Sequence, residues 1–217
     1  SSMRPPTPCC AGCANGARTS RATRRHVEHV QCVGGIFGLG VGILCLCKVR
    51  RRRTFIHVLS SSVGLRKIKI ATWNINSVRL RAPIVADFIN EAAPDILCLQ
   101  EIKCQTAEFP SKVFKDLGYN HFVIRGQKGW HGVAIASKIP LTEVEEPKFC
   151  MHDHARVAAA KIGDSDIIIH NLYVPAGGDI PDAAQNDKFA HKLDFLAQMD
   201  AYYKQKMGQY IVVGDLN

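Results

Sequence analysis

The chain has 217 residues, 47% of them hydrophobic and 22% charged, which is enough for one well-packed domain of ordinary globular composition. Its formal net charge is +9, but the charge is unevenly distributed. Residues 1–66 contain 11 Lys or Arg and one acidic residue, a net charge of +10, whereas residues 67–217 contain 17 Lys or Arg and 18 Asp or Glu, a net charge of −1. The overall basicity is therefore no evidence that residues 67–217 bind nucleic acid, and that case must rest on particular residues.

Residues 1–66 have the composition of an extension that forms no domain of its own. Pro, Ala, Ser, Arg and Cys dominate residues 1–32 without a sustained period, which predicts disorder. Six of the nine cysteines lie in the first 47 residues, but no second half of a zinc site with suitable spacing follows Cys9-Cys10-x-x-Cys13. Residues 33–47 form an apolar run that is short for a membrane span and begins late for a signal peptide.

We rank three interpretations of this extension. The first is that it is not native to the working protein, the second is an organellar presequence, and the third is a membrane anchor over residues 33–47. The remaining cysteines, Cys98, Cys104 and Cys150, are scattered and are typical of free thiols in an intracellular protein. We therefore expect an intracellular and primarily cytoplasmic protein.

Residues 67–217 alternate between strand and helix patterns. Residues 67–74 alternate polar and apolar side chains, while residues 95–101 are mostly apolar and predict a strand buried on both faces. Residues 187–206 have the spacing of an amphipathic helix with Phe189, Leu193, Leu196, Met199 and Tyr203 on its apolar face. Further strands are expected at 119–124, 132–137, 156–162, 166–174 and 210–213, and further helices at 82–92 and 113–117. The order predicts an α/β domain in which sheets pack together with helices outside.

Polar side chains gather where several of the predicted strands end. Residues two apart on a strand point to the same side, so each of these strand ends presents its polar groups in one direction. Carboxylates and amides without a cysteine or histidine set suit a hard divalent cation, Mg²⁺ or Mn²⁺. Taken singly, each residue has an ordinary role in a turn, at the surface or in packing; taken together, they predict a site. The residues are Asn74, Asn76, Gln100, Glu101, Asn171, Tyr173, Asp215 and Asn217.

The segment before the strand expected at residues 156–162 contains a second pattern typical of metal sites. His152-Asp153-His154 has the pattern of a metal-binding triplet, but it lies in a loop before a predicted strand. Because loop histidines are more often solvated, we leave this triplet out of the predicted site.

Five segments resemble, in order and spacing, the exonuclease III branch of the endonuclease/exonuclease/phosphatase superfamily. They include Trp73-Asn74-Ile75-Asn76, Leu99-Gln100-Glu101-Ile102-Lys103, Gln127-Lys128-Gly129-Trp130-His131-Gly132, Asn171-Leu172-Tyr173-Val174-Pro175 and Gly214-Asp215-Leu216-Asn217. The resemblance covers residues 67–217 and none of residues 1–66. It implies a four-layer α/β sandwich.

The resemblance also implies a role for each matched residue. Glu101 resembles the principal metal ligand, and Asn74 resembles a second ligand or a water-mediated one. Asp215 resembles the residue that orients or deprotonates the attacking water. The phosphate would be contacted by Tyr173 and Asn217, with Asn171 and Arg156 as further substrate-binding residues.

The implied reaction is Mg²⁺- or Mn²⁺-dependent hydrolysis of DNA phosphodiesters at abasic sites, with 3′→5′ exonuclease and 3′-phosphatase activities. The implied partner is double-stranded DNA with abasic sites or blocked 3′ ends. The resemblance implies no small-molecule cofactor, and it implies that the protein is a monomer. Because the family continues past its Gly-Asp-x-Asn strand and supplies a Ser-Asp-His motif there, we expect residues 67–217 to be the N-terminal part of such a domain, with the C-terminal part missing. Two alternatives stay open: a truncated, non-catalytic product, and a membrane-tethered phosphodiesterase of the same superfamily.

Overall fold

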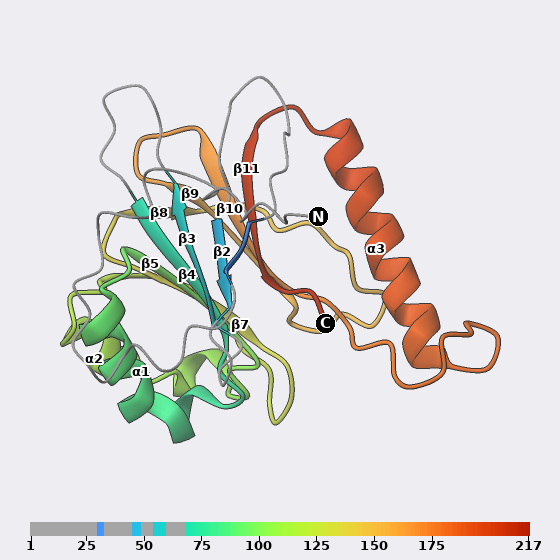
Figure 1. Cartoon of the computed structure of the whole chain (residues 1–217), viewed down its shortest axis with the longest axis horizontal. Helices are drawn as coiled ribbons and strands as arrows, with labels where there is room; N and C mark the ends of the chain where they lie inside the picture. The colour runs from blue at the N-terminus through green and yellow to red at the C-terminus, as the bar shows by residue number, and fades with distance from the viewer. Residues whose placement is uncertain (1–29, 33–44, 49–53, 60–67) are drawn as a thin grey trace, which may run out of the picture.

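The computed structural model describes residues 30–32, 45–48, 54–59 and 68–217, with the backbone alone in the first three ranges. Two sheets pack face to face, with helices α1 (Val78–Ala92) and α2 (Ser111–Lys115) outside one sheet and α3 (Asp187–Gln205) outside the other (Figure 1). The expected four-layer α/β sandwich is therefore confirmed.

The first sheet has the strand order β1-β2-β3-β4-β5-β7-β6. Strands β4 and β5 are parallel, and every other neighbouring pair is antiparallel. Because β4 and β5 run in the same direction, their carboxyl ends lie next to each other at the same end of the sheet. The strands are β1 (Val30–Cys32), β2 (Cys45–Lys48), β3 (Thr54–Leu59), β4 (Ile68–Asn74), β5 (Ile96–Gln100), β6 (His121–Arg125) and β7 (Val133–Ser137).

The second sheet has the order β11-β10-β9-β8, and its two longest strands are the parallel pair β10 and β11. The antiparallel pair β9 and β10 forms the hairpin expected around Gly163. Its strands are β8 (Leu141–Glu143), β9 (Val157–Ile162), β10 (Ile167–Tyr173) and β11 (Gln209–Asp215). The paired ends of β10 and β11 bring Tyr173 opposite Asp215.

Strand β5 shows how the layers are filled. All five of its residues are buried, as its apolar sequence predicts, because both faces are covered. Leu97 and Leu99 pack against the helices, whereas Ile96 and Cys98 face the second sheet. A third cluster, centred on Phe195, packs α3 against the outer face of the second sheet.

Two details differ from the sequence-based expectation. Helix α1 begins at Val78 rather than near Pro83, because the backbone N–H of Val78 donates to the carbonyl of Ile102 and anchors the first turn. On α3, Leu193 is 45% exposed, whereas Phe195 is fully buried. The buried face of α3 follows its docking angle on the sheet, which periodicity does not give.

The expected extension over residues 1–66 falls mostly outside the described residues. Three short segments of it are strands β1, β2 and β3, which lengthen the first sheet beyond β4. The boundary at residues 66 and 67 stays a prediction, and most of the apolar run over residues 33–47 lies outside the described ranges. Among the residues that the structure describes, no helix combines the length and apolar character needed to cross a membrane.

Candidate active site

Four predicted site residues meet at the carboxyl ends of strands from both sheets. The amide Nδ2 of Asn74, at the end of β4, donates to Glu101 Oε1 (2.8 Å) and to Asp215 Oδ2 (2.6 Å). The hydroxyl of Tyr173, at the end of β10, donates to the same Glu101 oxygen (2.9 Å). Two carboxylates, an amide and a phenol that are up to 141 residues apart therefore form one hydrogen-bonded group.

Backbone bonds hold the segments that carry this group. The N–H of Ser77 donates to the carbonyl of Glu101 (2.7 Å), and the N–H of Lys103 donates to the carbonyl of His131 (3.0 Å). Five non-glycine residues here have φ between 48° and 83°, a conformation that costs roughly 1–3 kcal/mol each and clusters at functional sites. They are Asn76, Ser77, Glu101, Lys103 and His131. Such strain persists only where the surrounding contacts impose it.

The carboxylate of Glu101 is held in its charged form. Burial by itself would raise the pKa of Glu101, but hydrogen bonds from Asn74, Lys103 and Tyr173 more than offset burial and lower the pKa below its ordinary value. Lys103 also pairs with the second carboxylate oxygen, with Nζ 3.0 Å from Oε2. At neutral pH Glu101 is therefore an anion whose position is set by three donors.

Tyr173 is a proton donor throughout the neutral range. Burial, the hydrogen bond to Glu101 and the charge of Glu101 raise the pKa of Tyr173 to about 12. Arg156 supports the ring from the other side, because its guanidinium stacks over it (4.8 Å to the centroid) and donates to the Tyr173 carbonyl (3.1 Å). Arg156 is only 6% exposed, so in this structure it contacts Tyr173 rather than open solvent.

Asp215 and Asn217 flank the end of β11 in different ways. Asp215 faces Asn74, whereas the Asn217 side-chain amide donates to the carbonyl of Val174 (2.7 Å). The Asn217 N–H donates to Asp215 Oδ1 (3.1 Å), which makes a local turn around the carboxylate. Gly214 is required here, because its φ is 145° and a Cβ would lie 1.9 Å from the Leu172 carbonyl oxygen.

Asn171 lies deeper than the other predicted site residues. It is fully buried, and its Nδ2 donates to the carbonyls of Leu99 and Ala134 in the first sheet (2.9 and 3.0 Å). Its Oδ1 accepts from Gln100 Nε2 (2.6 Å). With all three of these bonds made inside the protein, Asn171 joins the two sheets beneath the site and does not reach the surface where a substrate would lie.

The donor set fits a hard cation. Glu101 and Asp215 converge on the single nitrogen of Asn74, so an electronegative position lies between two carboxylates. The Glu101 side chain is 18% exposed, which leaves room for the water ligands that Mg²⁺ retains. Oxygen ligands from Glu101 and the amide of Asn74 match the preference of Mg²⁺ and Mn²⁺ and would exclude a soft ion, and the carboxylate of Asp215 lies beside them.

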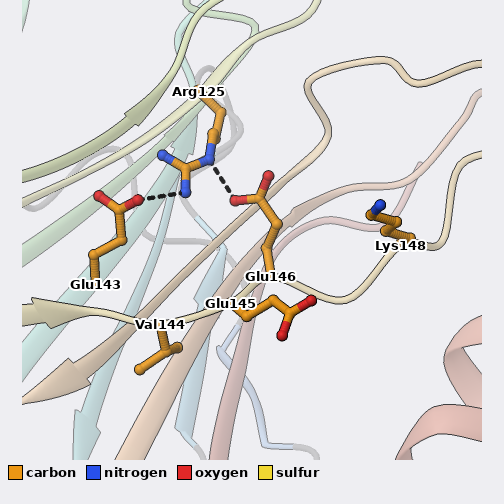
Figure 2. A pocket seen from close by; sticks show the side chains of 6 residues that line it. All are labelled: Arg125, Glu143, Val144, Glu145, Glu146 and Lys148. Carbon is orange, nitrogen blue, oxygen red and sulfur yellow. Dashed lines mark hydrogen bonds and ion pairs between the residues drawn. The ribbon is translucent and has the colours of Figure 1, made fainter.

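A shallow pocket formed by the end of β6 and by β8 with the segment after it does not compete with this site. Figure 2 shows Arg125 between Glu143 and Glu146, to which it forms ion pairs, with Val144, Glu145 and Lys148 alongside. Three carboxylates against two cations give this pocket a net negative charge, which repels a polyanion. Arg125 is already neutralised by its two partners, which leaves Lys148 as the pocket's other cation beside three carboxylates.

The fold and the strand-end group define a class: an α/β sandwich with an acidic, oxygen-donor site where the two sheets meet at their carboxyl ends. The chain belongs to the Endonuclease/Exonuclease/phosphatase family, whose model matches residues 71–217.

Known relatives place the chain within this family. It is 29% identical over 163 residues to exodeoxyribonuclease III of Haemophilus influenzae, covering 69% of this chain and 57% of the relative. It is similar to an AP endonuclease structure from Archaeoglobus fulgidus (37% identity, TM-score 0.58, 69% of this chain and 57% of that one). A 3′ phosphatase from Neisseria bound to a product DNA hairpin is also similar (31% identity, TM-score 0.58, 68% and 56%). The resemblance to the exonuclease III branch is confirmed, and the chain spans a little over half the length of these relatives.

Sequence reasoning gave no role to two residues that the structure brings to the group. Lys103 pairs with Glu101 and donates to Asn76 Oδ1 (2.6 Å), and the ring of His131 lies 6.0 Å from that of Tyr173. Both lie in segments that carry the family resemblance, and this location could have indicated that they are near the site. Their contacts depend on left-handed turns that the residue types do not predict.

Proposed function

We propose that this chain carries the metal and phosphate site of a Mg²⁺- or Mn²⁺-dependent nuclease that hydrolyses DNA phosphodiesters at abasic sites and 3′ ends. The observation that carries the proposal is the hydrogen-bonded group of Glu101, Asn74, Tyr173 and Asp215 at the ends of four strands. The names of the relatives supply the substrate class, since they include an exodeoxyribonuclease, an AP endonuclease and a 3′ phosphatase bound to DNA.

Each residue has a role that follows from its chemistry. Glu101 and Asn74 would hold the cation, which when bound neutralises charge on a phosphoryl oxygen and on the leaving oxygen. Asp215 accepts a proton from, or orients, the water that attacks from its side of the phosphate. Tyr173 donates a hydrogen bond to a phosphate oxygen and meets the charge that develops there. Asn217 supplies an amide donor beside Asp215.

Arg156 acts through Tyr173. Its stacking and its bond to the Tyr173 carbonyl fix the phenol against Glu101, so we assign it as a positioning residue. Asn171 has the same kind of role beneath the site, where it joins the sheets that carry Glu101 and Tyr173.

Exposed groups beside the site suit a nucleic acid strand. Trp130 is 70% exposed, and the Lys103 ammonium lies 5.9 Å from the centre of its ring. An exposed aromatic face and a cation side by side can stack on a base and contact a phosphate. This local pair, rather than the net charge, is the evidence in the chain for a DNA partner.

The test uses the full chain and a labelled DNA duplex with one stable abasic-site analogue. We expect incision at the analogue that requires Mg²⁺ or Mn²⁺ and is lost with chelator and in Glu101→Gln. The matched control is Glu108→Gln, which removes an exposed carboxylate that pairs with Arg79 and lies outside the group.

The alternatives predict different results. Binding to the duplex without incision would support the non-catalytic alternative and overturn the proposed activity. Incision that survives Glu101→Gln would overturn the metal assignment. Recovery of the full-length chain in the membrane fraction would favour the tethered alternative over a freely diffusing nuclease.

A further inference from the structure

A second group of ligand-type side chains lies outside the proposed nuclease site. Cys150 and His154 belong to the segment between β8 and β9, and His191 lies in the first turns of α3. The Sγ of Cys150 is 3.2 Å from Nε2 of His191, and one ligand atom from each of the three residues lies within 4.8 Å of the others. Side chains from two separate segments therefore converge on one point.

One polar atom of this Cys150–His154–His191 cluster has no partner. Nδ1 of His154 is buried and has no hydrogen-bond partner, and His191 is only 8% exposed. An unpaired buried nitrogen costs roughly 1–3 kcal/mol, so it calls for a specific explanation. A structural histidine elsewhere in this chain, His170, makes the ordinary arrangement, with Nδ1 2.6 Å from the Tyr203 hydroxyl.

A metal ion binds the neutral form of histidine. Burial, followed by the charge of Arg156, lowers the pKa of His154 and of His191 below the ordinary value. A neutral imidazole has a free lone pair on one nitrogen, whereas a protonated one has none.

We propose that Cys150, His154 and His191 form a binding site for Zn²⁺ or a similar borderline transition-metal ion. Thiolate and imidazole are the ligands such ions select, whereas Mg²⁺ takes oxygen. In a tetrahedral zinc site, adjacent ligand atoms are roughly 3.5 Å apart, so the cluster needs side-chain rotations rather than a change of fold. The ion would supply the missing partner of His154.

His152 is positioned to complete the shell. Its ring lies 4.5 Å from that of His191 and 5.4 Å from that of His154, and its side chain is exposed. With His152 the site has one sulfur and three nitrogen ligands; without it, water takes the fourth position. The triplet His152-Asp153-His154, set aside on sequence grounds, would then provide two of the four ligands.

Neighbouring charges both oppose and support the site. The guanidinium of Arg156 lies beside Cys150 and hydrogen-bonds to it, which repels a cation but stabilises a metal-bound thiolate from the outer shell. The carboxylates of Asp153 and Asp194 act on His154 and His191 in the opposite sense to Arg156. The ion would clamp the β8–β9 segment to α3 and so hold Arg156, and through it Tyr173, in place.

The test uses Co²⁺ as a spectroscopic probe for the zinc site, in the full chain with its six N-terminal cysteines changed to serine. Excess Mg²⁺ keeps the oxygen-donor site occupied. We expect one equivalent of Co²⁺ to produce a thiolate-to-metal charge-transfer band, which Zn²⁺ displaces. The band should vanish in Cys150→Ser. Affinity for Co²⁺ should fall at least about 100-fold in His154→Ala and in His191→Ala, because losing a residue that only supports a ligand already costs up to about 100-fold.

The matched control is His121→Ala. His131 stacks on His154 of the cluster, and His121 lies at the opposite end of the β6–β7 pair from the turn that carries His131. Circular dichroism checks that each variant folds. X-ray absorption on the zinc-loaded parent gives an answer that needs no substitution: one sulfur and two or three nitrogens are expected. A sulfur-free shell, no band in the folded parent, or a band that survives Cys150→Ser would overturn the proposal. None of these measurements involves DNA cleavage, so failure here is separate from failure of the proposed nuclease.

Discussion

Two groups of potential ligands, both contacted by Arg156, differ in how their polar atoms are satisfied. Around Glu101, every acceptor has a donor: Asn74, Lys103 and Tyr173 all bond to the carboxylate. Around Cys150, a thiol faces an imidazole and a buried nitrogen of His154 has no partner. Hydrogen bonds between its own side chains fix the geometry of the first group, whereas the second contains a buried nitrogen that no side chain satisfies.

The difference also separates the ions that each group can bind. Carboxylate and amide oxygens select Mg²⁺ or Mn²⁺, while thiolate and imidazole select Zn²⁺ and its neighbours. Because the ligand types do not overlap, two ions could be bound close together without competing. The variants Glu101→Gln and Tyr173→Phe change the first group and leave the second as the reference.

The largest effect is expected for Glu101→Gln. The change keeps the shape and removes the charge that would hold the cation, and the charge stabilisation lost is worth several kcal/mol, or roughly 10³-fold in rate. Single-turnover cleavage of the abasic duplex measures the loss, with Glu108→Gln as the control. The Co²⁺ band of the cysteine cluster should be unchanged. A rate within about 10-fold of the parent would contradict the metal assignment.

Asn171→Ala should produce the largest loss of stability. It leaves the Leu99 and Ala134 carbonyls and the Gln100 amide with fewer partners in the buried region between the sheets, which costs about 3 kcal/mol. The matched change Asn217→Ala, at an exposed position, should cost less than about 0.5 kcal/mol. Chemical denaturation of both variants measures the difference. Equal losses would contradict the joining role of Asn171.

Tyr173→Phe should reduce cleavage about 100-fold, because it removes one donor to the developing charge and keeps the ring. Since the pKa of Tyr173 is about 12, the loss should be the same at every pH in the neutral range. The ring still stacks under Arg156, so affinity for Co²⁺ at the cysteine cluster should not change. The pH–rate profiles of parent and variant provide the comparison. A loss that disappears as the pH rises within the neutral range would contradict the donor role.

The oxygen-donor group was predictable from sequence because each residue stands at the end of a strand. The period of two and the order of the motifs were sufficient to bring Asn74, Glu101 and Asp215 to one edge. The same rule does not predict how deeply a side chain is buried. Asn171 shares a strand face with Tyr173, yet it is fully buried between the sheets. Burial depends on how the two sheets stack, which no local pattern contains.

The cysteine cluster was not predictable in this way. Cys150 and His191 are 41 residues apart, and they meet only because α3 docks with His191 and Phe195 inward rather than Leu193. The pattern His152-Asp153-His154 was visible, but its partners were not. Similarly, α1 starts at Val78 through a bond to Ile102, a contact between segments that the residues near Pro83 do not reveal.

The smallest predicted effect uses His170 as a reference for a histidine with a structural role. Burial lowers the pKa of His170 to about 4, while an unfolded histidine has its ordinary value of 6.5. Between these values the unfolded state binds more protons, so the free energy of unfolding falls as the pH is lowered from 6.5 toward 4. For one histidine the fall is at most about 1.4 kcal/mol over the first pH unit below 6.5.

Other buried histidines add to the same slope, so the measurement is the difference between parent and His170→Gln. Denaturation curves at several pH values in this window, with chelator present, should give a shallower pH dependence for the variant. Addition of Zn²⁺ should stabilise both proteins equally, because His170 bonds to Tyr203 and takes no part in the cysteine cluster. Identical slopes for parent and variant would show that His170 accepts a proton as readily in the folded state as in the unfolded one. Unequal stabilisation by Zn²⁺ would instead couple His170 to the metal site, and the contrast between satisfied and unsatisfied histidines would fail.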